Sequence, residues 1–157
     1  MQRSIRAFFL ATALFTAGCE GFFTPSTPRT TDYKPAHQAA RAGDAGAIEQ
    51  AARTDPTALT ADDSEQDTPL HLAAFHNKID VVKVLLAQRN VNVNARNVAG
   101  QTPLILAARA GHQEVVRLLL LAGADRKIVD SRGWTAETWA TKTHHDDTAN
   151  LLRRGSQ

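Results

Sequence analysis

Apolar and polar positions along the chain follow a pattern that repeats at a nearly constant interval. The segment TPLHLAA, starting at Thr68, returns as TPLILAA at Thr102, and a degenerate copy opens at Thr135. An apolar run with the spacing of a second helix follows each clear copy, at residues 81–86 and 115–120. A fixed period of about 33 residues indicates stacked helical units, because one unit cannot bury its own apolar face.

The opening of each clear unit contains residues that begin a helix. The hydroxyls of Thr68 and Thr102 can accept a backbone N–H bond at a helix N-terminus. Pro69 and Pro103 suit the first helical position, where the missing N–H costs nothing. The pattern therefore predicts short first helices beginning at these Thr-Pro pairs.

Turn residues predict where the helices end. Gly111 can end the first helix of its unit in the left-handed conformation, and Asn77 stands at the same place one unit earlier. Gly123 is expected to turn the chain out of the second helix into an extended hairpin that runs to Gly133.

These motifs resemble the ankyrin repeat, most closely over residues 100–125. The resemblance covers about residues 36–154 and implies an all-α repeat solenoid, in which helix-turn-helix units are joined by β-hairpin-like loops. It also implies that His71, in the Thr-Pro-Leu-His motif, makes structural hydrogen bonds between units.

The sequence predicts about four units, two clear and two degenerate caps, because the terminal units of a solenoid need more polar outer faces. The first unit is read as lacking its Thr-Pro opening before His37. In the last unit, Ala136 and Trp139 depart from the expected motif, and Thr148 and Ala149 replace the valine pair of the second helix.

The N-terminus has the pattern of an export signal. Arg3 and Arg6 precede an apolar run from residue 7 to residue 17, which is shorter than the ~20 residues that cross a bilayer. We expect residues 1–18 to form a signal peptide. Residues 19–35 are expected to be a cysteine-bearing spacer, rich in Pro and Thr, that holds the repeat domain of residues 36–154 away from a membrane.

Residues 15–19, FTAGC, resemble the lipobox of bacterial lipoproteins, although Thr16 stands where Leu is commonest. The resemblance implies acyl chains on Cys19, and two or more chains give stable membrane anchoring. Glu20 follows the cysteine in place of Asp, which favours the periplasmic face of the outer membrane. The alternative is an ordinary signal peptide next to a stray thiol.

Charge and motifs narrow the function. Removal of residues 1–18 leaves 16 basic and 16 acidic residues, so the remaining chain has no net positive charge. Because binding to nucleic acid depends on neutralising phosphates, this balance argues against a nucleic-acid partner. The sequence has no Gly-x-Ser-x-Gly, phosphate-loop, dinucleotide or His-Glu-x-x-His motif, and its one cysteine excludes a thiolate zinc site. We expect no enzyme, no cofactor and no metal site. A metal-dependent enzyme acting through His144 and His145 is the least favoured alternative, because adjacent residues seldom converge on one ion.

The resemblance also implies where a partner would bind, since ankyrin stacks usually bind on the concave side formed by first helices and hairpin tips. Cations flanking an aromatic residue are common at binding hot spots and predict an acidic protein surface as partner. The alternative is a solvated surface, with Trp134 packing as part of the cap. The predicted partner-binding residues are Arg41, Phe75, His76, Arg109 and Lys142 on the first helices, and Asp67, Gln101 and Trp134 on the hairpins.

These observations together predict a monomeric, non-enzymatic interaction module, anchored through Cys19, that binds or shields another protein of the bacterial envelope. A more specific alternative is an immunity protein that neutralises a toxin targeted to the periplasm.

Overall fold

The computed structural model describes residues 35–154, and within this range the chain forms eight α-helices, one 3-10 helix and no β-strand. The predicted signal peptide, Cys19 and nearly all of the spacer lie outside the described residues. The elements are α1 (Pro35–Ala42), α2 (Ala45–Thr54), η1 (Pro56–Leu59), α3 (Pro69–Phe75), α4 (Ile79–Leu86), α5 (Pro103–Ala110), α6 (Gln113–Leu121), α7 (Ala136–Lys142) and α8 (Asp146–Arg154).

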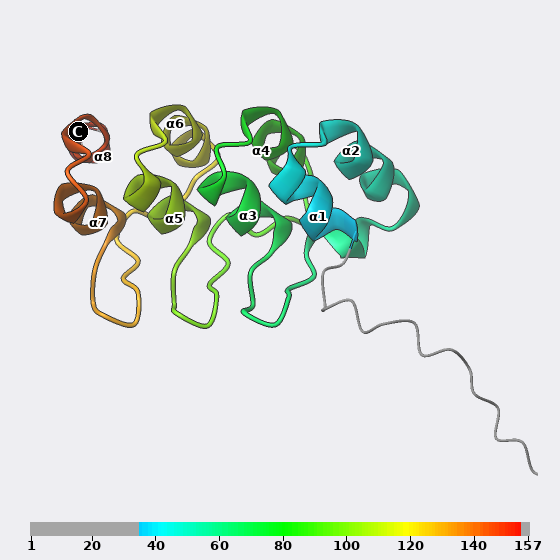
Figure 1. Cartoon of the computed structure of the whole chain (residues 1–157), viewed down its shortest axis with the longest axis horizontal. Helices are drawn as coiled ribbons and strands as arrows, with labels where there is room; N and C mark the ends of the chain where they lie inside the picture. Colours follow the sequence, from blue (N-terminus) through cyan, green and yellow to red (C-terminus); the bar gives the residue numbers. More distant parts are fainter. Residues whose placement is uncertain (1–34, 155–157) are drawn as a thin grey trace, which may run out of the picture.

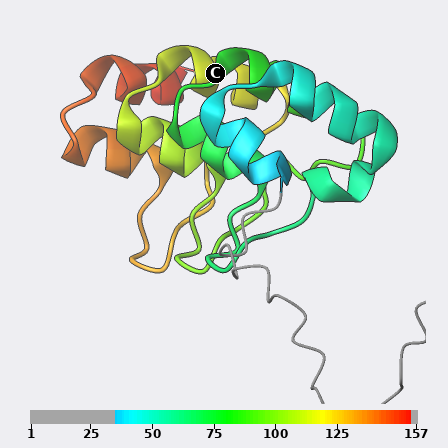
Figure 2. The same ribbon diagram turned by 45° about the vertical axis from the view of Figure 1, so that its right-hand side comes forward.

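The helices form four antiparallel pairs that stack in two layers. The inner layer contains α1, α3, α5 and α7 side by side, and the outer layer contains α2, α4, α6 and α8 (Figure 1). The long loops that join one pair to the next extend together from the inner layer, away from the outer helices (Figure 2). The prediction of an all-α repeat solenoid is therefore confirmed.

The core is a continuous line of contacts between the two layers. Small side chains on the inner helices let neighbouring repeats approach closely, and branched side chains on the outer helices fill the space above them. The fully buried positions that recur from one middle repeat to the next are Leu70, Ala73, Ala74, Val81, Val82 and Leu85, followed by Leu104, Ala107, Ala108, Val115, Val116 and Leu119.

Threonine hydroxyls begin the inner helices. Thr102 and Thr135 each accept the backbone N–H of the residue three positions on, at 3.3 and 3.2 Å. At the start of α3 the arrangement differs, because the backbone N–H of Thr68 donates to Nδ1 of His71 at 3.1 Å. The side chain of His71 thus takes part in beginning its own helix.

Two buried histidines connect neighbouring repeats. Nε2 of His37 donates to the backbone carbonyl of Asp67 at 2.8 Å, and Nε2 of His71 donates to that of Gln101 at 3.1 Å. Both histidines are completely buried. Because Nδ1 of His71 accepts a bond while Nε2 donates one, its ring is held in the neutral form.

The first repeat differs from the sequence-based expectation in two ways. Pro35 is the first residue of α1, as Pro69 is of α3, so this repeat has its opening proline and Pro35 does not belong to the spacer. The repeat also contains η1, which the pattern did not predict. Asp55 caps η1 by accepting the backbone N–H of Thr57 at 3.1 Å, and Leu59, the last residue of η1, is buried in the core.

Residues with positive φ end each inner helix. Gly43, Asn77, Gly111 and His144 have φ of 91°, 56°, 76° and 61°. Gly111 is also sterically constrained, because a Cβ atom there would lie 2.6 Å from Nδ1 of His145. The same turn is therefore made by two glycines, one asparagine and one histidine.

Backbone hydrogen bonds shape the long loops and join them to one another. Val98 N donates to Glu65 O at 2.9 Å, and Ser131 N donates to Ala99 O at 3.0 Å, so each loop tip bonds to the next. Within each loop, a bond of 3.0–3.1 Å joins residues four apart, namely Asp63 N to Asp67 O, Asn97 N to Gln101 O and Asp130 N to Trp134 O.

Candidate functional site: the inner face

Arg109 occupies the centre of the inner face, which is the surface formed by the inner helices and the long loops. Its guanidinium carbon lies 5.4 Å from the ring centre of Phe75 on α3 and 5.3 Å from that of Trp139 on α7. Both distances are in the range of a cation–π interaction. One arginine thus bridges aromatic side chains from the two neighbouring repeats.

A second set of contacts extends this arrangement toward the C-terminal end. Trp134 and Trp139 meet edge to face, with ring centres 4.9 Å apart. Arg132 lies 5.7 Å from the ring of Trp134 and 5.5 Å from that of Trp139, and Lys142 lies 5.6 Å from Trp134. We call the six residues Phe75, Arg109, Arg132, Trp134, Trp139 and Lys142 the aromatic–cation cluster.

Asp130 supports this cluster from below the surface. It is 5% exposed, and its carboxylate accepts the indole N–H of Trp139 at 2.8 Å and the backbone N–H groups of Arg132 and Trp134 at 2.9 and 3.0 Å. Burial acts to raise the pKa of Asp130, but these hydrogen bonds outweigh burial and hold the pKa below its usual value. Asp130 therefore stays ionised and holds the Trp139 side chain and the backbone at Trp134.

The two hairpin residues Gln101 and Asp67 differ from the expectation. Gln101 is only 7% exposed, so its side chain offers little surface to a partner. Its amide oxygen accepts a weak bond from Arg109 at 3.4 Å, and its nitrogen lies 3.5 Å from a carboxylate oxygen of Asp130. Asp67 is half-buried and accepts a bond from Asn97 at 2.9 Å, so its side chain joins neighbouring loops.

The N-terminal part of the inner face holds the other predicted residues. The rings of His76 and Phe75 meet edge to face at 5.1 Å, and Phe75 is 38% exposed. Burial lowers the pKa of His76, and the positive charges of Arg41, Lys78 and His112 lower it further. Arg41 on α1 is thus close enough to His76 to act on it electrostatically.

The structure thus brings most of the predicted residues together, and it adds two that the final predicted set did not include. Trp139 replaces the leucines that stand at positions 72 and 106 of the middle repeats, and Arg132 lies at a loop tip. The replacement of leucine by tryptophan at position 139 can be read directly from the sequence. What was not visible is that Trp139 would accept two arginines on its ring faces.

The His144–Asp147 segment lines a shallow hollow beside Gly111. Among residues 35–154, no group of three or more His, Cys, Asp or Glu side chains is arranged to hold a metal ion. His145 instead packs against the turn at Gly111.

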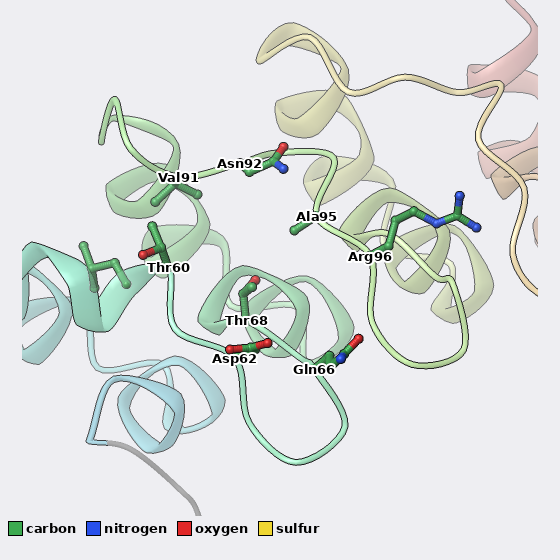
Figure 3. A pocket seen from close by; sticks show the side chains of 9 residues that line it. Thr60, Asp62, Gln66, Thr68, Val91, Asn92, Ala95 and Arg96 are labelled. Atoms are coloured by element: carbon green, nitrogen blue, oxygen red, sulfur yellow. The ribbon is translucent and has the colours of Figure 1, made fainter.

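Another hollow lies between η1 and the first two long loops (Figure 3). It has an apolar floor that includes Val91 and Ala95, with Asp62 on its rim. Figure 3 shows the guanidinium of Arg96 directed away from Asp62, and Arg96 donates to the carbonyl of Val129 at 2.8 Å. The charged groups of this hollow do not converge on a common point, so the hollow offers no arrangement for acid–base chemistry.

No helix within residues 35–154 is long and apolar enough to cross a membrane.

The two-layer stack and the repeated helix pairs define the chain as a helical-repeat solenoid. Comparison with known families matches residues 89–157 to ankyrin repeats in three copies and residues 65–98 to a single ankyrin repeat. These two matches together cover more than half of the chain, which belongs to the ankyrin-repeat family.

Several known proteins contain a similar segment. The chain is 35% identical over 120 residues to neurogenic locus notch homolog protein 1 of Xenopus tropicalis, which covers 76% of this chain and 5% of that protein. It is 37% identical over 87 residues to protein glp-1 of Caenorhabditis elegans, and the match covers 55% of this chain and 7% of that protein. It is 38% identical over 92 residues to glycerophosphocholine phosphodiesterase gde1 of Schizosaccharomyces pombe, and the match covers 58% of this chain and 8% of that protein.

The chain therefore spans less than a tenth of the length of each of these relatives, and the similarity is one of repeat domains. Ankyrin repeats bind other proteins, so the chain is a protein–protein interaction module. The family is typically non-catalytic, although one of these relatives is named as a phosphodiesterase.

Proposed function

We propose that this chain captures an acidic segment of another protein of the bacterial envelope on its inner face, through the aromatic–cation cluster. The observation that carries the proposal is the position of Arg109 between Phe75 and Trp139. A guanidinium whose faces stack on aromatic rings keeps its N–H edge available for carboxylates, which it binds in a forked geometry.

The charges around Arg109 favour the same class of partner. Arg132 and Lys142 lie on the tryptophan rings of the same cluster, and Arg41 continues the positive charge onto α1. Asp130, the carboxylate that contacts the cluster from within the described repeats, is buried and occupied by its hydrogen bonds. The accessible part of the cluster is therefore cationic and aromatic, a composition typical of binding hot spots.

The proposed location of the chain in the cell is inferred from the sequence. The lipobox-like segment at Cys19 supports acyl anchoring at the periplasmic face of the outer membrane, and the Pro/Thr-rich spacer gives the repeats reach from that surface. The anchored module would hold or shield its partner. An immunity protein would use the same inner face against a toxin, and the identity of the captured protein separates the two roles.

Capture from envelope extracts of the native organism tests the proposal. The double variant Phe75→Ala/Arg109→Ala should reduce the amount of captured partner by about 100-fold, because it removes the two central contacts. Arg53→Ala, a highly exposed cation on α2, is the matched control and should leave capture unchanged. In the same cells, Cys19→Ser should move the protein from the membrane fraction to the soluble fraction.

Equal capture by the wild type and the folded double variant would contradict the inner-face site. Membrane retention of the Cys19→Ser variant would contradict the anchor while leaving the binding site untouched.

A further inference from the structure

The outer face of the last two repeats has an apolar surface that the packing of the stack covers only in part. Leu121, at the end of α6, is 85% exposed, although most leucines of the repeats are buried or half-buried. Leu120 and Leu151 lie beside it, and together they line a hollow between α6 and α8. Arg117, Arg126 and Arg154 form the rim of this hollow, which we call the α6–α8 groove.

The equivalent groove between α2 and α4 shows that the repeat geometry does not require such a surface. Arg53 stands there in place of Leu121, two repeats earlier, and Ala52 stands in place of Leu120, with Ala87 across from them on the neighbouring repeat. The groove's arginine, Arg53, pairs with Glu49 at 3.8 Å. Small side chains and balanced charge are thus sufficient between outer helices, whereas the α6–α8 groove has leucines and arginines.

Two of the three arginines of the α6–α8 groove, in the part of the chain that the structure describes, carry positive charge that no ion pair balances. Within residues 35–154, no ion pair joins Arg117 or Arg154 to an acidic side chain, while Lys83, one repeat before Arg117, pairs with Asp80 at 3.7 Å. Arg126 is held at the rim, because its Nη1 donates to the carbonyl of Leu152 at 2.7 Å.

We propose that the α6–α8 groove is a second docking site, and that it takes an acidic amphipathic helix of a partner protein. Apolar side chains of that helix would cover Leu121 and Leu151, and its carboxylates would pair with Arg117 and Arg154. This is recognition of a helix in a groove, with charge complementarity setting the class of partner. The site lies on the layer opposite the inner face, so both surfaces can be occupied at once (Figure 1).

The same residues fit an anionic membrane less well. An apolar hollow between two helices suits a row of side chains better than a flat bilayer.

The test uses the full-length chain carrying Cys19→Ser, so that acylation contributes nothing. The probe is a synthetic helical peptide of about 15 residues with leucines on one face and glutamates on the other, and a second peptide has lysines in place of the glutamates. The glutamate peptide should bind, and its methyl contacts should shift the NMR signals of Leu121. Leu121→Asp and Arg117→Glu should each weaken its binding by at least about tenfold.

Ala87→Asp is the matched control, because it places the same carboxylate at the equivalent position one repeat earlier. It should change binding by less than about twofold, as substitutions distant from a site usually do. Unchanged thermal unfolding of all three variants shows that the loss is local, since Leu121, Arg117 and Ala87 are exposed.

Three results would overturn the proposal. They are equal binding of the lysine and glutamate peptides, equal weakening by Ala87→Asp and Leu121→Asp, and no peptide binding together with binding to phosphatidylglycerol vesicles. The last result would assign the groove to a membrane surface.

Discussion

The two middle repeats and the last repeat share one backbone arrangement but are held together by different side chains. In the middle repeats the outer helices bury the pairs Val81–Val82 and Val115–Val116 completely. In the last repeat Thr148 and Ala149 take these places, and a hydrogen bond from Trp139 to Asp130 adds a polar contact next to the core. The middle of the stack is therefore stabilised mainly by apolar packing, and its end depends more on specific polar contacts.

The largest effect should come from shortening a core side chain of a middle repeat. Leu119→Ala should lower the free energy of unfolding by about 2–5 kcal/mol, because Leu119 is fully buried and its removal leaves a cavity. The matched change in the last repeat, Leu152→Ala, should cost less, since the smaller Thr148 and Ala149 offer Leu152 fewer apolar contacts than the valine pair offers Leu119. Urea unfolding followed by circular dichroism measures both. Equal losses would mean that the two regions are packed alike.

The turn between the paired helices gives a second contrast. Gly111→Ala should destabilise the chain by about 1–3 kcal/mol, because it combines an unfavourable positive φ with a contact between the new Cβ and the ring of His145. His144→Gly, at the equivalent turn of the last repeat, should instead raise stability by up to about 1 kcal/mol, since glycine adopts this φ without strain. Thermal unfolding of the two variants should shift in opposite directions, and a shared direction would contradict this account.

A fall in pH should lower the stability of the first of the two middle repeats through His71. In the last repeat the corresponding residue is Thr138, which does not titrate. Burial lowers the pKa of His71 below its ordinary value of 6.5, so the folded state favours the neutral ring. The unfolded chain binds the proton more readily, and stability present above pH 6.5 is lost as the pH falls below it. This single group can account for at most about 1.4 kcal/mol per pH unit.

Urea titrations at pH 7.5 and 5.5 measure this effect. His71→Gln keeps a donor for the Gln101 carbonyl but does not titrate, so its stability should depend less on pH. An equally steep loss in this variant would place the acid sensitivity elsewhere.

The sequence was sufficient for the repeat architecture because its local signals agree with the global fold. The Thr-Pro openings, the alanine pairs and the valine pairs recur at one period in the two middle repeats, where both kinds of pair are fully buried in each copy. The opening proline of the first repeat was assigned to the spacer because no threonine precedes it, although Pro35 lies one repeat before Pro69.

The composition of the inner face was only partly predictable. Motif position located Phe75 and Arg109 correctly as neighbours, since first helices of adjacent repeats stand side by side. It could not show that Gln101 turns inward or that Asp130 holds Trp139, because those contacts depend on side-chain directions in two loops and one helix. The same limit applies to Arg132, whose contact with two rings depends on the shape of a loop tip.

The cross-repeat bonds described above have a consequence for how the chain folds. The bonds from His37 and His71 and those between the loop tips each reach only to the next repeat, so contacts are local in sequence and folding can begin in the apolar middle and spread outward. The aromatic–cation cluster needs α3, α5 and α7, and it is complete only when the last repeat docks. A partner on the inner face would therefore bind only chains that have finished folding, and by mass action it would slow fraying of their C-terminal end.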